Sequence, residues 1–279
     1  MTEKPNIMRI AVCSAVGGVG RTTITANLAA ILAKEHVKVT VIDADLQFGD
    51  IALAFDLHPT RTIKDAAERK DKDNIHFYVM NHESGVNVLP APDRPEYAEL
   101  IIPDFLNSII DTLNDNAEVL LIETQAGLND LNIQVMEKAD LILVVGTPRM
   151  AVLKNTKLLI ETLSMLGLKD KARLVLNKAT SNTVIKSKDM AELTNMEQAF
   201  FLPFVDKHID HSLDMGLPIV SSHPKLTFSK EMEKLAESLN LYDSNTKGNS
   251  GIFSKFTNKG HRSRGIKNEF ISADPIQES

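Results

Sequence analysis

The chain has 279 residues, of which 43% are hydrophobic and 24% charged, and this suits one α/β domain with a full core. Its formal net charge of -6 at pH 7 gives the whole chain no electrostatic support as a nucleic-acid binder. One cysteine, Cys13, excludes an internal disulfide and a CxxC metal site within one chain, and no apolar run approaches the roughly 20 residues of a membrane-spanning helix.

Short apolar, β-rich runs alternate with helical patterns along most of the chain. Strands are predicted at residues 9–14, 37–42, 86–89, 119–122, 141–145, 173–176 and 200–202. Helices are predicted at residues 22–34, 63–68, 103–114, 151–166, 186–195, 209–215 and 229–239. Several strands are apolar throughout, which is typical of central strands covered on both faces. We therefore predict an α/β fold with a mostly parallel, doubly wound sheet over residues 1–241.

Composition changes at Tyr242. Residues 242–279 are polar and sparse in apolar side chains, so we expect a flexible tail. Residues 242–269 of this tail are basic, because only two acids, Asp243 and Glu269, oppose the cations Lys247, Lys255, Lys259, Arg262, Arg264 and Lys267. It contains one small apolar cluster at residues 252–256, which could meet a membrane surface or be part of a solvated linker.

A glycine-rich turn follows the first predicted strand and leads into the first predicted helix. Gly17, Gly18 and Gly20 would let successive backbone N–H groups face a phosphate, and the helix N-terminus would add partial positive charge. The Thr22 hydroxyl would be placed to bind Mg²⁺. The competing interpretation is a turn between strand and helix that binds no ligand.

Polar side chains also end three later strands. Asp43 and Asp45 are two residues apart after residues 37–42, and Glu123 follows residues 119–122. Ligands of open α/β sheets bind at this carboxyl edge. Asn177 ends the strand at residues 173–176, and an Asn amide suits an adenine edge, although Asn is also common in turns.

The turn resembles the deviant Walker A motif of the ParA/MinD family of P-loop NTPases, Lys-Gly-Gly-x-Gly-Lys-Thr-Thr. The match covers Gly17, Gly18, Val19, Gly20, Thr22 and Thr23. Both family lysines are replaced, the first by Val16 and the second by Arg21, and arginine is larger, planar and forked. The resemblance implies binding of ATP and Mg²⁺ by these loop residues, with Arg21 at the phosphates.

The same resemblance implies roles for the strand-end residues. Asp45 would position the attacking water, and Asp43 would lie near the Mg²⁺. Glu123 replaces the usual Walker B aspartate, so the metal residues would be Thr22, Asp43 and Glu123. Asn177 and Pro203 would lie at the adenine. Val16, Arg21 and Glu123 together suggest weak or absent hydrolysis, so enzymatic activity stays open.

Two stretches, residues 45–57 and 88–99, are similar to the CpaE/TadZ branch of this family, the localisation factors of Flp/Tad pili and related secretion machines. The phosphate-loop lysines are often replaced in that branch. The resemblance covers residues 8–240, and the N-terminal receiver-like domain of many CpaE proteins is not expected here.

The leading hypothesis is therefore an atypical ATP-binding spatial organiser that localises a pilus or secretion machine. Alternatives are an active MinD or flagellar-number type of ATPase switch at the membrane, a scaffold that binds no nucleotide, and a ParA-like DNA-partitioning factor. The acidic body gives DNA binding little electrostatic support, so DNA is not expected as a partner. We expect a cytoplasmic homodimer that contacts machine proteins and, through residues 252–256, the inner face of the cell membrane.

Overall fold

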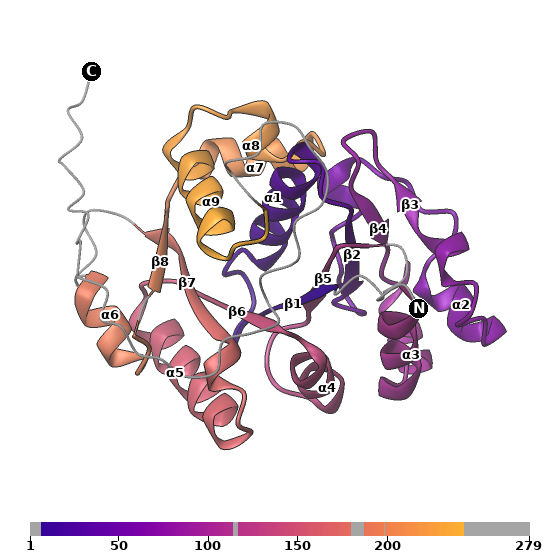
Figure 1. Ribbon diagram of the computed structural model, residues 1–279, viewed down its shortest axis with the longest axis horizontal. Helices are drawn as coiled ribbons and strands as arrows, with labels where there is room; N and C mark the ends of the chain where they lie inside the picture. The colour runs from indigo at the N-terminus through magenta and orange to yellow at the C-terminus, as the bar shows by residue number, and fades with distance from the viewer. Residues whose placement is uncertain (1–6, 114–116, 180–186, 198, 243–279) are drawn as a thin grey trace, which may run out of the picture. The chain divides into compact units, whose positions relative to one another are not determined.

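The computed structural model describes residues 7–113, 117–179, 187–197 and 199–242. Its centre is a sheet that has eight strands in this part of the chain, in the order β3-β4-β2-β5-β1-β6-β7-β8 (Figure 1). Every neighbouring pair is parallel except β3 with β4. The strands are β1 (Met8–Cys13), β2 (Val39–Ala44), β3 (Met80–Asn81), β4 (Asn87–Leu89), β5 (Val119–Thr124), β6 (Leu141–Gly146), β7 (Ala172–Ala179) and β8 (Ala199–Pro203).

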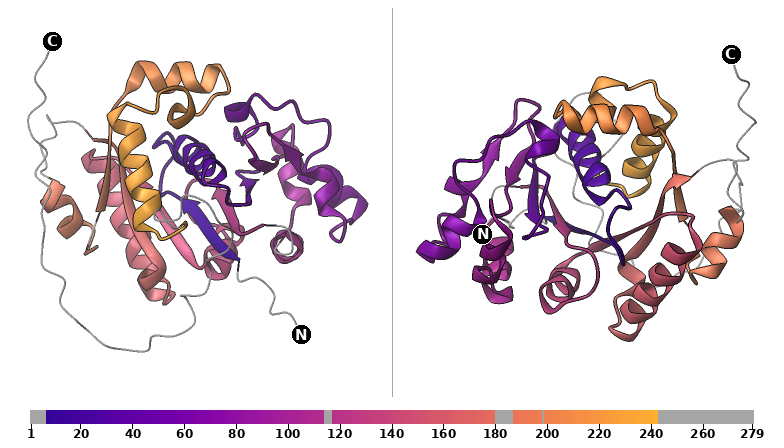
Figure 2. Two further views of the ribbon diagram at one scale, coloured as in Figure 1. Left: turned by 45° about the horizontal axis from the view of Figure 1, so that its top comes forward. Right: turned by 180° about the vertical axis from the view of Figure 1, so that it is seen from behind.

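Helices cover both faces of this sheet (Figures 1 and 2). One face carries α1 (Arg21–Lys34), α7 (Asp206–Asp214), α8 (Ile219–Ser222) and α9 (Thr227–Ser238). The other carries α2 (Ile63–Arg69), α3 (Pro103–Leu113), α4 (Asp130–Lys138), α5 (Met150–Met165) and α6 (Ser187–Leu193). Short 3₁₀ helices lie at η1 (Leu53–Phe55), η2 (Ile75–Tyr78), η3 (Pro95–Leu100) and η4 (Lys169–Lys171). The predicted doubly wound α/β fold is confirmed.

Each central strand contributes to two cores. In β1, Ile10 and Val12 pack on the face of α1, while Ala11 and Cys13 pack on the opposite face. Successive strand residues point to opposite faces, so a strand covered on both sides must be apolar throughout. Burial raises the pKa of the Cys13 thiol to about 12.

Helix α1 is enclosed by the fold. All its residues from Thr23 to Leu32 are buried, because the sheet lies on one side and α8 and α9 lie on the other (Figure 2). Inside this contact, Asn27 Oδ1 accepts a hydrogen bond from Val220 N at 2.9 Å. The phosphate loop is therefore attached to a helix that the rest of the domain holds in place.

Some elements were not predicted, among them the antiparallel edge strand β3 and helix α4. Asn129 caps α4 by accepting a hydrogen bond from Asn132 N at 2.7 Å. Within the described ranges, every helix is too short or too polar to cross a lipid bilayer. The predicted tail cluster at 252–256 lies outside the described residues, which end at Tyr242.

Candidate functional site: the phosphate loop and its carboxylates

The loop between β1 and α1 presents bare backbone. Gly20 is the N-cap of α1 with φ 94°, a left-handed conformation, and no side chain caps the helix. Gly17 and Gly18 are exposed, and a Cβ on either would meet nothing within 4 Å. The first N–H groups of a helix have no partners within the helix. Backbone donors and the helix dipole therefore form a site suited to an anion.

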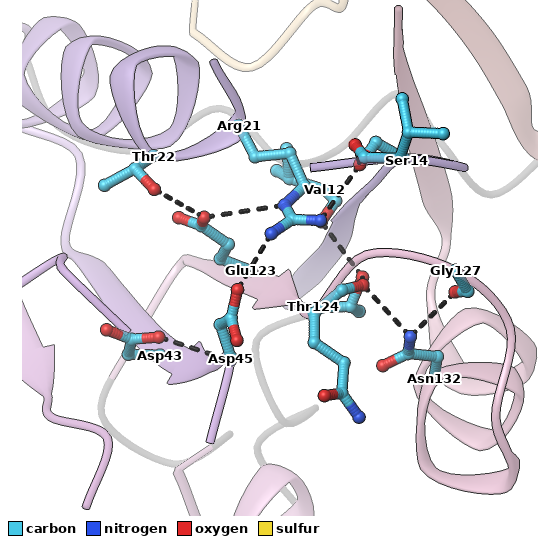
Figure 3. Close-up of polar contacts among 12 residues, drawn as sticks. Val12, Ser14, Arg21, Thr22, Asp43, Asp45, Glu123, Thr124, Gly127 and Asn132 are labelled. Carbon is cyan, nitrogen blue, oxygen red and sulfur yellow. Dashed lines mark hydrogen bonds and ion pairs between the residues drawn. The ribbon is translucent and has the colours of Figure 1, made fainter. Parts of the chain in front are cut away.

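Arg21, the first residue of α1, does not extend over this loop. Its guanidinium points under the loop, where Nη1 donates to Ser14 Oγ at 2.9 Å and Nη2 donates to Asp45 Oδ2 at 2.8 Å (Figure 3). Its Nε lies 3.7 Å from Glu123 Oε1. The side chains of Arg21 and Asp45 are only 10% and 16% exposed, so the pair is shielded from water. Arg21 thus connects the first strand to the carboxylates of β5 and of the segment after β2.

Glu123 lies beneath the first turn of α1. Its Oε1 accepts a hydrogen bond from Thr22 Oγ1 at 2.7 Å (Figure 3). Among the described residues, its buried Oε2 has no hydrogen-bond partner. Burial raises the pKa of Glu123 to about 7, against the opposing effects of the Thr22 hydrogen bond and the Arg21 charge. Burial also raises the pKa of Asp45, although the Arg21 charge acts in the opposite direction.

Asp43 is buried next to Glu123 in the register of β2 and β5. Its carboxylate accepts hydrogen bonds from Asp45 N at 3.2 Å and Ile51 N at 3.0 Å. A Cβ on Gly49 would overlap this carboxylate, so the segment can pass only because residue 49 is glycine. Burial, and then the charge of Glu123, raise the pKa of Asp43 well above its ordinary value. Asp43 therefore holds the chain that follows β2.

Asn177, at the end of β7, contacts the phosphate loop from the opposite side. It is fully buried, its Nδ2 donates to Val19 O at 2.9 Å, and its Oδ1 accepts from Lys178 N at 2.8 Å. A Cβ on Gly20 would overlap Asn177 Nδ2. To read a base, the amide would have to exchange these two hydrogen bonds. Pro203 lies beside this strand end, opposite Ala179.

The other predicted residues lie in or beside the loop. Val16 is half-buried and packs beside the core that contains α1, while Val19 and Thr23 are buried. The segment after β5 also joins the loop, because Gly127 N donates to Ser14 O at 2.8 Å. Asn132 fixes this segment by donating to Gln125 O and Gly127 O (Figure 3).

Sequence reasoning missed Ser14 and Lys178, which contact Arg21 and the loop. Ser14 stands directly after β1, the usual position for a side chain at the carboxyl edge, and this was the available signal. Lys178 follows the predicted Asn177, but its direction depends on backbone geometry that the sequence does not display.

The site fits a nucleotide phosphate chain with Mg²⁺. The loop offers donors without side chains in front of them, and buried Arg21 Nε and Glu123 Oε2 are polar atoms with no hydrogen-bond partner in the described chain. Thr22 and Glu123 supply the hard oxygen donors that Mg²⁺ prefers. No group of three or more acidic, His or Cys side chains suited to a metal occurs in the described ranges. Mg²⁺ is commonly held by one or two carboxylates together with substrate phosphates, and Thr22 and Glu123 suit that arrangement.

Comparison with known proteins agrees with this architecture. The family model ParA, described as the NUBPL iron-transfer P-loop NTPase, matches residues 7–240. An uncharacterised ATP-binding protein of Methanocaldococcus jannaschii is 27% identical, over 82% of this chain and 86% of its own. The septum site-determining protein MinD of Thermotoga maritima is 29% identical, over 81% of this chain and 86% of its own.

A solved structure has the same fold. MinD of Pyrococcus horikoshii, complexed with Mg-ADP, superposes with a TM-score of 0.76 over 84% of this chain and 96% of its own, at 24% identity. The family model spans all eight strands of the described sheet, and the loop, the strand-end carboxylates and the fold occur together in this chain. The chain therefore belongs to the ParA/MinD family of P-loop NTPases.

Proposed function

We propose that this chain is an ATP-binding spatial organiser of the CpaE/TadZ type, which localises a pilus or secretion machine and hydrolyses ATP weakly or not at all. The observation that carries this proposal is the ion pair between Arg21 and Asp45. This ion pair leaves the phosphate loop free to bind phosphates. It also occupies Asp45, the carboxylate that would position water for hydrolysis.

The Arg21–Asp45 pair opposes hydrolysis for a physical reason. A carboxylate that positions water needs an oxygen that can accept a hydrogen bond from that water. Here Asp45 Oδ2 is occupied at 2.8 Å by a guanidinium, which stays charged at every working pH. Because the pair is largely shielded from water, the attraction between its charges is screened less than that of an exposed surface pair. Arg21 thus keeps Asp45 away from the role that the family resemblance implies.

The residues of this chain divide the binding task. The loop N–H groups would hold phosphates while Arg21 stays paired with Asp45, and Thr22 and Glu123 would hold Mg²⁺ with Asp43 behind them. Bound ATP would add the negative charge of its phosphates at the loop, and the nucleotide-bound organiser would differ from the nucleotide-free one in this charge. Asn177 and Pro203 lie at the end of the sheet where the nucleoside is proposed to bind.

The proposal extends to partners and place. A septum site-determining relative supports a positional role. We propose a homodimer that contacts pilus or secretion proteins in the cytoplasm. Residues 252–256, within the proposed tail 242–279, would give it a weak peripheral contact with the membrane.

An active ATPase switch of the MinD type is the second candidate, favoured by the 2.7 Å contact between Thr22 and Glu123. This contact keeps a carboxylate beside the hydroxyl, as a Walker B acid requires. Iron transfer, named in the description of the family model, has less support because the chain's one cysteine is buried. The raised pKa of Cys13 also keeps it a thiol, whereas metals bind the thiolate.

Equilibrium binding of ATP and ADP with Mg²⁺, with phosphate release followed in the same sample, tests the proposal. The expected result is binding of both nucleotides without steady release. Steady phosphate release by the wild-type protein would instead support the active ATPase switch. No binding at millimolar nucleotide would support a scaffold that binds no nucleotide.

Arg21→Lys tests whether the ion pair is the cause. Lysine cannot form the forked contact with Ser14 and Asp45, so release should rise by at least about tenfold, or about 1.4 kcal/mol. Arg9→Lys is the matched control, because Arg9 pairs with Asp140 at 3.1 Å at the other end of β1. Release that stays equally low in both variants would show that the Arg21–Asp45 pair does not limit hydrolysis.

A further inference from the structure

Lys178 reaches the phosphate loop from the end of β7. Its Nζ donates a hydrogen bond to Gly18 O at 3.2 Å, at an exposed position. Gly18 is one of the two exposed glycines of the loop, so the ammonium group lies at the outer edge of the anion site.

The backbone conformation at Lys178 sets the direction of its side chain. Lys178 has φ 57°, a left-handed conformation that residues with a Cβ seldom adopt. Its N–H is held by Asn177 Oδ1 at 2.8 Å, and the pairing of β7 with β8 shifts register between Leu176 and Ala179. Bulges of this kind re-aim side chains next to functional sites. An unfavourable backbone conformation held by a fully buried amide turns Lys178 towards the loop.

The two cations at this loop differ in their surroundings. Arg21 is paired with Asp45 and lies near Glu123, whereas Lys178 forms no ion pair within the described part of the chain. They also approach from opposite sides of β1. The carboxylates belong to β5 and to the segment after β2, while Lys178 comes from β7. The unneutralised charge is therefore on the side away from the proposed metal residues.

We propose that Lys178 contacts the α- and β-phosphates of the bound nucleotide and supplies positive charge that the loop lacks at Val16. This inference rests on the proposed nucleotide binding. An ammonium group has three donors, so Lys178 could keep its contact with Gly18 O and still bind a phosphate oxygen. Because it lies away from the metal residues, its contribution is the same for ADP and ATP.

The test is calorimetric titration of the full chain with ADP and with ATP, both with Mg²⁺, at low and at high salt. Lys178→Met should weaken both nucleotides by about five- to tenfold at low salt, as expected for one charged hydrogen bond. The loss should shrink at high salt, because screening removes the charge term. Lys178→Arg should retain most of the affinity.

Lys171→Met is the matched control. Lys171 also donates to backbone carbonyls, at Ala139 O and Glu137 O, but at the opposite end of β7, and its loss changes the net charge equally. It should leave both affinities at the wild-type value. If Lys178→Met loses the same nucleotide affinity at all salt concentrations, Lys178 only supports the loop through Gly18 O and the proposed phosphate contact is wrong. Wild-type affinity in Lys178→Met would also overturn the phosphate contact. Wild-type protein that binds neither nucleotide would refute the proposed function as well.

Discussion

At the scale of one residue, burial favours the neutral form of Glu123 while the hydrogen bond from Thr22 favours its carboxylate. It is 1% exposed, and one of its oxygens has a hydrogen-bond donor in Thr22 while the other has none in the described chain. A buried carboxylate without full pairing is more stable when it is protonated. The result is a pKa of about 7, so the residue changes charge near neutral pH when no ligand is bound.

This pKa predicts a pH-dependent gain in stability for Glu123→Gln. The pKa rises from 4.5 to about 7 on folding, so ionisation opposes folding, and wild-type stability falls as pH rises through that window. Glutamine stays neutral. The free energy of unfolding of Glu123→Gln should therefore exceed that of the wild type only slightly near pH 4.5, and by about 3 kcal/mol near pH 7.

Urea denaturation across this pH window measures the difference. Exposed Glu96→Gln is the control and should show no comparable growth with pH. If the stability difference between Glu123→Gln and wild type does not change with pH, the buried carboxylate is not the titrating group.

At the scale of elements, the phosphate loop is locked between α1 and β7. Gly20 ends the loop with φ 94°, and Asn177 fills the space where a side chain at residue 20 would lie. Glycine here serves two purposes, the left-handed backbone and the close approach of the strand. The contact ties the start of α1 to a strand that is distant in sequence.

Gly20→Ala should therefore lower the free energy of unfolding by at least about 2 kcal/mol, because strain and overlap add. Gly17→Ala is the matched control in the same loop, since residue 17 has an ordinary φ and open space around it. Denaturant midpoints of the two variants give the comparison. Equal midpoints would mean that Asn177 moves aside without cost.

Much of the fold could be predicted because the strands are buried on both faces and so are apolar throughout. Helix α4 escaped prediction although its cap, Asn129, precedes an amphipathic run that includes Leu131 and Val135. The cap is weak evidence in sequence, since Asn is equally common in turns. The two-residue strand β3 is too short to give any periodic signal.

The site was only partly predictable for a different reason. The order of strands brings Asp43, Asp45 and Glu123 to one edge, as their positions after apolar runs suggested. The partner of Arg21 could not be deduced, because a guanidinium can reach either outward to phosphates or inward to Asp45, and only the packing decides. The direction of Lys178 depends on its positive φ and a register shift, which leave no pattern in the sequence.

At the scale of the whole molecule, the proposed membrane contact predicts an effect of one tail substitution. Phe256→Glu places a charge in the apolar cluster of residues 252–256 and should abolish sedimentation of the full chain with anionic phospholipid vesicles in the presence of ATP. Phe77→Glu, at a residue of η2 that is 63% exposed, is the control and should sediment like the wild type. Sedimentation of Phe256→Glu at the wild-type level would remove the tail from the proposal.

The enclosure of α1 also has a mechanical consequence. A helix buried from Thr23 to Leu32 can release its amide protons to solvent only when the layers around it separate, so it opens with the whole domain. The loop at its start is thereby mounted on a fixed support.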